Sequence, residues 1–105
     1  MDFEIPAQKL GLEVDEYLEL IELFIETGSN DLKGIEDAMA KNDVQAVVER
    51  SHSLKGASGN LGITEIYERA KNIENRAREN NLDGVEDTVK EIKLHINDII
   101  SSMES

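Results

Sequence analysis

Apolar residues recur at helical spacing along almost the whole chain. Between about Glu13 and Glu26 they fall three or four positions apart, which places one apolar stripe on one face of a helix. Residues 27–30 then read Thr-Gly-Ser-Asn, a run that is typical of a turn. A shorter stripe continues to about Lys41. The pattern therefore predicts two helices separated by a turn at 27–30.

Further apolar stripes follow a break at Asn42 and Asp43, where Asp43 is a good N-cap residue. Residues 60–62, Asn-Leu-Gly, predict the next turn. The stripes predict three more helices, from Val44 to about Gly59, from Ile63 to about Asn80, and from Leu82 to about Met103. Four of the predicted helices have three or more turns, and short loops make sequential helices pack antiparallel. We therefore expect an all-α fold, an antiparallel up-down four-helix bundle.

The first twelve residues are too few for a full helix of this bundle. We expect a short helical turn that begins near Pro6, because proline is tolerated in the first turn of a helix. Phe3, Ile5 and Leu10 would then cap one end of the bundle. A chain of 105 residues indicates one domain, with a capping segment at 1–12 and the bundle at 13–104.

The charge and composition exclude several classes of function. The chain has 23 acidic and 11 basic residues and a net charge of −12, which repels nucleic acid and anionic membranes. No apolar run approaches the roughly 18 residues of a membrane-spanning helix, and the first residues lack the pattern of a secretory signal. The absence of cysteine excludes disulfides and thiolate zinc sites and fits a reducing compartment. We therefore expect a cytoplasmic protein whose partners are proteins.

The segment 51–62 departs from the ordinary helical pattern. Gly56 and Gly59 stand where the helix should continue, and each costs about 1 kcal/mol relative to alanine. Because a helix turns about 100° per residue, both glycines lie on one strip with His52, about a third of a turn from the centre of the apolar stripe. His52 is therefore predicted to face solvent, beside a surface that is cleared of bulk.

This arrangement suits phosphoryl transfer. A solvent-facing neutral imidazole is a nucleophile near neutral pH. Lys55, three residues after His52, can reach toward the imidazole and neutralise a phosphoryl group. The chain has no Gly-rich loop followed by Lys-Ser/Thr that could hold a nucleotide. The phosphoryl group would therefore come from one partner protein and leave to another, so we expect a carrier and not an enzyme.

Residues 52–62 resemble the signature of the histidine-containing phosphotransfer (HPt) family, which is His, any residue, Leu, Lys, Gly, small residues and then Leu-Gly. The helix order is similar over essentially the whole chain. The resemblance implies a phosphorelay intermediate in which His52 exchanges a phosphoryl group, through its distal ring nitrogen, with the aspartate of a response-regulator receiver domain. A hybrid histidine kinase is the other partner it implies. By the same resemblance, Lys55 steadies the phosphoryl group and Gly56 keeps the approach open.

The resemblance also assigns supporting residues. Glu74 stands where family members place a Gln or Glu that holds the other imidazole nitrogen. We expect Gly56, Gly59, Ser53 and Glu49 on the surface that binds the partner. Magnesium would belong to the receiver, so this domain is expected to need no cofactor or metal of its own, and to be a monomer.

Three other interpretations stay open on the sequence. Glu49 and His52 have the Glu-x-x-His spacing of di-metal helical bundles, but such a site needs a second motif, and Glu91 and His95 have the wrong spacing. A non-catalytic acidic interaction module would keep the shape of the family without phosphoryl transfer. The phosphotransfer domain of a chemotaxis-type kinase has a similar layout.

Overall fold

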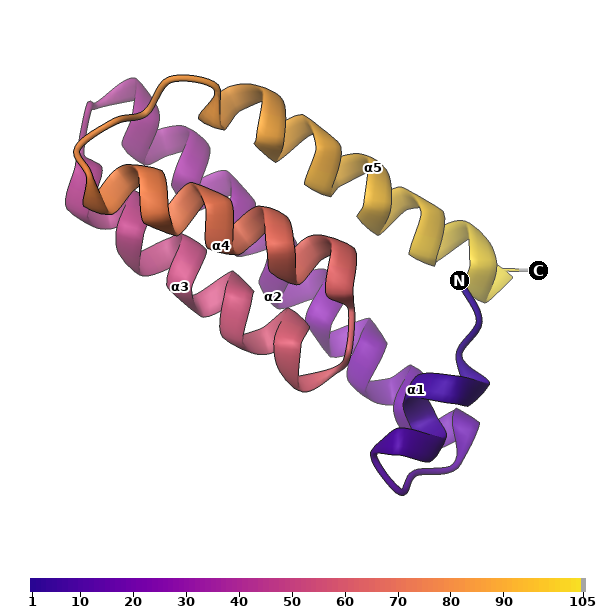
Figure 1. Cartoon of the computed structure of the whole chain (residues 1–105). Helices are drawn as coiled ribbons and strands as arrows, with labels where there is room; N and C mark the ends of the chain where they lie inside the picture. Colours follow the sequence, from indigo (N-terminus) through magenta and orange to yellow (C-terminus); the bar gives the residue numbers. More distant parts are fainter. Residues whose placement is uncertain (105) are drawn as a thin grey trace.

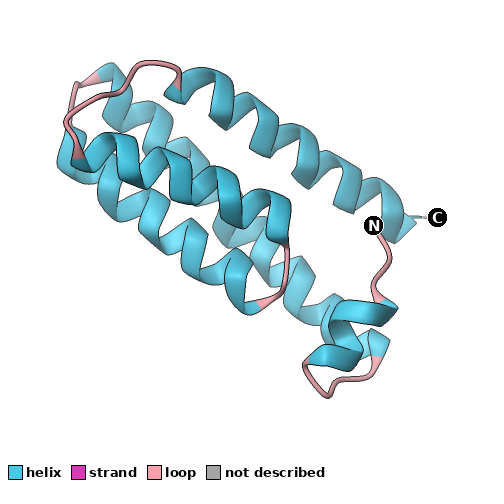
Figure 2. Ribbon diagram, viewed as in Figure 1, coloured by secondary structure: helices cyan, strands magenta, loops and turns pink. Residues whose placement is uncertain are grey.

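The computed structural model describes residues 1–104, and all regular structure in this range is helical (Figures 1 and 2). The helices are α1 (Glu4–Lys9), α2 (Val14–Ala40), α3 (Val44–Asn60), α4 (Thr64–Arg78) and α5 (Val85–Glu104). The last four form an antiparallel bundle, and α1 lies at one end of it against α2 (Figure 1). The predicted fold class is confirmed. Within the described range, no helix has the length and apolar character needed to cross a bilayer.

Helix α2 is continuous, so the predicted turn at 27–30 is wrong. Gly28 is buried where α2 packs against α3, and a Cβ atom at this position would lie 3.4 Å from Leu54 Cδ1. This is an ordinary van der Waals distance, so Gly28 lies on the packed face of α2 without breaking the helix. Ser29 and Asn30 are exposed on the surface of α2, where residues of turn type lower helix stability only slightly.

The other helix boundaries follow from local hydrogen bonds and backbone geometry. The Asp43 carboxylate accepts the backbone N–H of Ala46 at 3.1 Å and caps α3, as expected. The left-handed backbone conformation that commonly ends helices occurs after four of them, with φ of 72° at Gly11, 53° at Asn42, 73° at Gly62 and 61° at Asn80. Helix α5 begins at Val85 and not at Leu82, since Gly84 adopts a φ of 77° just before it.

The short helix α1 covers the end of the bundle through different residues than those predicted. Ala7 is buried, and the Phe3 ring packs against the Tyr17 ring with centroids 6.4 Å apart. Ile5 and Leu10, which were expected to cap the bundle, are both exposed. The prediction for these two side chains is therefore wrong. A helix of six residues turns only one side toward α2, and Ala7 is its buried residue.

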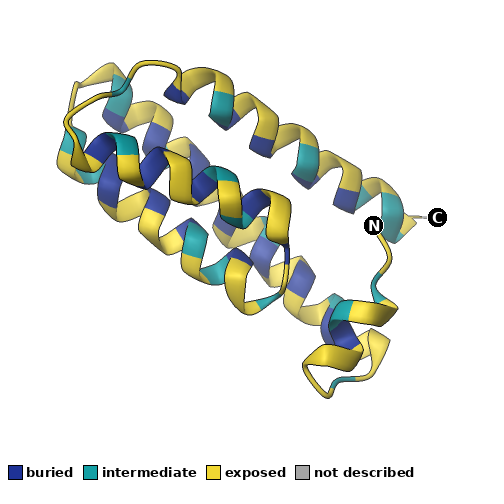
Figure 3. Cartoon of the chain, viewed as in Figure 1, coloured by how far each residue is buried: buried dark blue, intermediate teal, exposed yellow. Residues whose placement is uncertain are grey.

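Buried residues lie on the inward faces of the helices (Figure 3). The largest that are fully buried are Tyr17, Ile21, Leu32, Ile35, Leu54, Ile66, Ile73 and Ile92. Helix α3 packs mainly against α4 and α2, while α5 packs against α4 and α2 on the side of the bundle away from α3 (Figure 1). The outer face of α3 therefore remains open to solvent between α2 and α4.

Candidate functional site

His52 lies on the outer face of α3, as the helical pattern predicted. Its side chain is 63% exposed, while Ser51 and Leu54 on the same helix are fully buried. The Ser51 hydroxyl donates to the backbone carbonyl of Val47, so this buried polar group is satisfied inside the helix. Burial of Ser51 and Leu54 sets the rotation of α3, and this rotation turns the imidazole outward.

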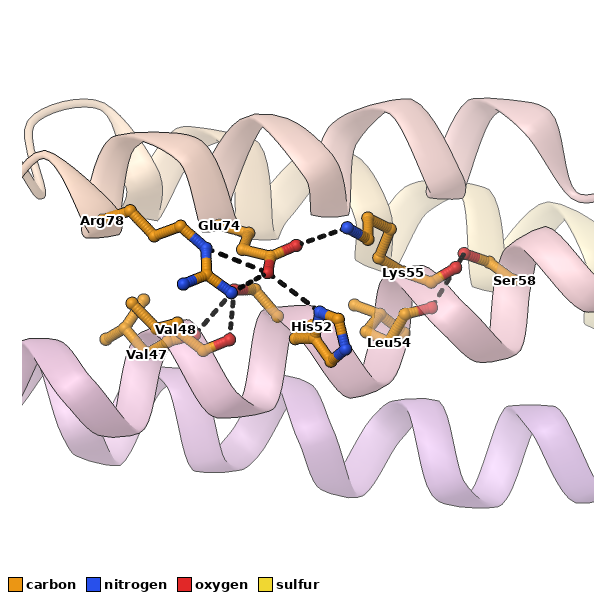
Figure 4. A network of polar contacts seen from close by, with 9 residues as sticks. Val47, Val48, His52, Leu54, Lys55, Ser58, Glu74 and Arg78 are labelled. Carbon is orange, nitrogen blue, oxygen red and sulfur yellow. Dashed lines mark hydrogen bonds and ion pairs between the residues drawn. The ribbon is translucent and has the colours of Figure 1, made fainter.

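Glu74 on α4 is the centre of the polar contacts around this histidine (Figure 4). Its carboxylate is almost fully buried, and its Oε2 atom lies 2.9 Å from His52 Nδ1. Arg78, one turn later on α4, donates to the same oxygen from Nη2 at 2.7 Å and from Nε at 3.2 Å. Lys55 Nζ lies 2.8 Å from the other oxygen, Oε1, as an ion pair that lacks ideal hydrogen-bond geometry. One carboxylate thus joins the imidazole, the ammonium and the guanidinium.

These contacts keep the Glu74 carboxylate ionised. Burial alone would raise its pKa, but the contacts with Lys55, Arg78 and His52 outweigh burial and lower the pKa to about 2. An ionised carboxylate can only accept hydrogen bonds. The proton in the contact with His52 therefore sits on Nδ1, which donates it to Glu74.

The other ring nitrogen of His52, Nε2, is the one available for chemistry. It has no hydrogen-bond partner among the described residues, and Figure 4 shows it on the side of the ring away from Glu74. In the neutral ring a proton on Nδ1 leaves the lone pair on Nε2. The site therefore presents a nucleophilic nitrogen to solvent.

Of the two cations beside the carboxylate, one was predicted from the sequence and the other was missed. Lys55 was expected near the imidazole, and the structure brings the two residues together through their shared partner, Glu74. Arg78 was missed, although its position four residues after Glu74 on one helix is a recognisable signal for an ion pair. Its side chain remains 57% exposed, so it can also meet an approaching anion.

The two glycines near His52 differ in their surroundings. A Cβ atom at Gly56 would have no neighbour within 4 Å, so this part of α3 is bare backbone facing solvent. At Gly59 a Cβ atom would lie 3.0 Å from the Tyr67 ring on α4. The expectation that Gly59 leaves the surface beside His52 cleared of bulk is therefore corrected, because the Tyr67 side chain of the domain itself fills the space next to this glycine. Gly59 is still exposed, and its contact with a partner stays a prediction.

The remaining predicted site residues, Glu49 and Ser53, both lie on the exposed face of α3. Glu49 accepts a long hydrogen bond of 3.4 Å from Gln45 Nε2. The Ser53 hydroxyl donates to Asp31 Oδ2 on α2 at 2.9 Å. Within residues 1–104, no three acidic or histidine side chains converge as metal ligands, so Glu49 and His52 belong to no such cluster.

A family model described as the Hpt domain matches residues 19–102 of this chain. The chain belongs to the Hpt domain family. The match includes α3 and α4, which carry His52, Lys55 and Glu74. Membership makes this a histidine-containing phosphotransfer domain, the carrier module of phosphorelays. Among curated proteins, no sequence matches the chain significantly.

A solved structure has the same fold as this Hpt domain. It is the histidine-containing phosphotransfer protein B (HptB) from Pseudomonas aeruginosa PAO1, with a TM-score of 0.83 and 24% sequence identity. The similarity covers 99% of this chain and 92% of the HptB chain. The aligned region includes the short helix α1 as well as the four-helix bundle.

Proposed function

We propose that this Hpt domain carries a phosphoryl group on Nε2 of His52 and exchanges it with the aspartate of a response-regulator receiver domain. The donor at the other end of the relay is a second receiver, such as the one in a hybrid histidine kinase. One monomer of the domain meets one receiver at a time. The magnesium ion that such a reaction uses would lie in the receiver, and this domain contributes no cofactor.

The observation that carries this proposal is the contact between His52 Nδ1 and the ionised Glu74. It leaves Nε2 free, exposed and unprotonated in the neutral ring. In the step that loads the domain, Nε2 attacks the phosphorus of the aspartyl phosphate, an N–P bond forms, the P–O bond to aspartate breaks and the carboxylate leaves. The reverse step unloads it.

The charges around His52 suit both steps. Once Nε2 carries the phosphoryl group, the ring with its Nδ1 proton is cationic, and the buried Glu74 carboxylate offsets that charge. Lys55 and Arg78, held by the same carboxylate, supply positive charge for the phosphoryl oxygens. Gly56 leaves room for the acidic pocket of the receiver to come close to the ring.

Phosphoryl transfer between purified proteins tests the proposal. The receiver domains of the source organism would each be phosphorylated with radiolabelled phosphodonor and mixed with the wild-type domain or with His52→Gln. We expect at least one receiver to label the wild type and none to label the variant, whose circular dichroism should be unchanged because His52 lies outside the core. Failure of every receiver to label the wild type would favour a non-catalytic interaction module.

A further inference from the structure

Both basic residues of α3 are held by a buried carboxylate of a neighbouring helix. Lys55 pairs with Glu74 on α4, and Arg50 pairs with Asp31 on α2. These two acids are the buried charged residues of the described chain. The exposed face of α3 therefore has an anchored cation along each edge, and the proposed phosphoryl chemistry uses only the α4 edge.

Arg50 lies in a notch on α2 that a glycine creates. A Cβ atom at residue 34 would come within 2.7 Å of Arg50 Nε, so a residue with a side chain there would push the flexible Arg50 side chain out of its present position. The Arg50 Nη1 atom then reaches Asp31 Oδ1 at 3.4 Å. The sequence and the packing thus position this guanidinium at the outer surface of α2.

The contact with Asp31 leaves most of the Arg50 guanidinium unused. Charge-assisted hydrogen bonds are usually about 2.7–2.9 Å long, and this one is clearly longer. Ser53 already donates to the other oxygen of Asp31 at 2.9 Å. Half of the Arg50 side chain is exposed, and its remaining N–H donors have no partner among the described residues. A guanidinium in this state can receive a carboxylate in a bidentate pair.

Arg50 and His52 lie close enough for one partner to cover both. Two residues correspond to about 3 Å along the helix axis and to roughly 160° around it. The two side chains therefore stand at opposite edges of the exposed face of α3, His52 on the α4 side and Arg50 on the α2 side, with Glu49, Ser53 and Gly56 exposed between them. A protein that reaches His52 across this face also meets the α2 edge.

We propose that Arg50 is a docking contact for the receiver and binds a carboxylate on the receiver surface. This inference rests on the proposed function and names a residue that acts in docking and takes no part in the chemistry. The domain carries a net charge of −12, so an acidic partner is repelled by most of its surface. A positive charge on the same exposed helix face as His52 gives such a partner a favourable orientation.

The test separates docking from chemistry by loading the domain from a small phosphodonor and unloading it to a receiver. Arg50→Gln and a charge-matched control, Lys90→Gln on α5, would be labelled with phosphoramidate, a small donor that needs no docking surface. Each phosphorylated protein would then be mixed with rising concentrations of a receiver that accepts the label from wild type. We expect wild-type phosphoramidate rates for both variants, and a half-saturating receiver concentration raised roughly tenfold for Arg50→Gln alone. This rise should shrink as salt is added.

A second variant is needed because Arg50→Gln removes a partner from the buried Asp31 and could disturb the fold. Gly34→Ala keeps the net charge but displaces the Arg50 side chain from its notch, and it should also raise the half-saturating concentration. The inference is overturned if wild type, Arg50→Gln and Gly34→Ala saturate at the same receiver concentration. If wild type itself exchanges no label with any receiver, the proposed function fails first and the docking role falls with it.

Discussion

Glu74 Oε2 on α4 lies 2.9 Å from His52 Nδ1 on α3, and this contact joins the buried side of the bundle to its exposed nucleophile. The carboxylate is nearly inaccessible, whereas the imidazole is largely in solvent. A buried charge acts more strongly on its neighbours than an exposed one, because water screens it less. The contact therefore fixes both the orientation of the ring and the position of its proton.

Glu74 should contribute acid-sensitive stability. Its folded-state pKa of about 2 lies below its ordinary value of 4.5, so its contribution is present above about pH 4.5 and is lost as the pH falls toward 2. The shift corresponds to about 3 kcal/mol. Urea unfolding from pH 7 to pH 2 should show Glu74→Gln less stable than wild type at neutral pH, with the difference vanishing in acid. A difference that stays constant across this range would contradict the assignment.

Lys55 should speed phosphorylation of His52 without being needed for the fold. Lys55→Gln removes the positive charge next to the incoming phosphoryl group, and we expect labelling by phosphoramidate to slow roughly 10- to 100-fold. Its circular dichroism spectrum should match that of wild type. The control is Lys90→Gln, which makes the same charge change on α5 and should label at the wild-type rate. Equal rates for the two variants would remove Lys55 from the site.

A bulky residue at Gly56 should block the partner and spare the chemistry. A Cβ atom at this residue would have no neighbour within 4 Å, so the side chain of Gly56→Leu would start out into solvent. Transfer from a phosphorylated receiver should slow at least about tenfold, because the side chain stands in the approach to His52. Labelling by phosphoramidate should keep the wild-type rate. If the receiver transfers equally fast to the variant, Gly56 does not lie under the docked partner.

The two glycines should respond differently to alanine. Gly56→Ala places a methyl group in open solvent on a helix and should raise the free energy of unfolding by about 0.5–1 kcal/mol. Gly59→Ala places the same group 3.0 Å from the Tyr67 ring, so the gain in helix propensity is offset by displacement of that ring. Chemical denaturation compares them. An equal gain at both positions would show that Tyr67 does not constrain Gly59.

The sequence predicted the exposed histidine because the relevant signal is local. The rotation of α3 follows from the spacing of its apolar residues, and the placement of His52 and Gly56 depends on that rotation alone. Glu74 could be named only from the family resemblance, because its contact with His52 depends on how α4 packs against α3. Helical periodicity within one segment carries no such information.

Asp31 and Arg50 were missed because their contact also depends on how two helices pack, here α2 and α3. Residues 27–30 were interpreted as a turn, which gave no reason to expect Asp31 on the buried face of a continuous helix. With α2 continuous, Asp31 stands seven residues after Phe24 and seven before Ala38, in line with two buried side chains. Gly28 appeared to favour a turn, but it lies inside α2 on the face that packs against Leu54 of another helix.

The position of the phosphoryl group on the protein tests the central claim most directly. Wild-type domain labelled with ¹⁵N at its histidines would be phosphorylated with phosphoramidate and examined by NMR through the coupling between phosphorus and ring nitrogens. We predict one phosphorylated nitrogen, Nε2 of His52, with Nδ1 still protonated and His95 unmodified. A phosphoryl group on Nδ1 of His52, on His95, or on neither residue would contradict the account.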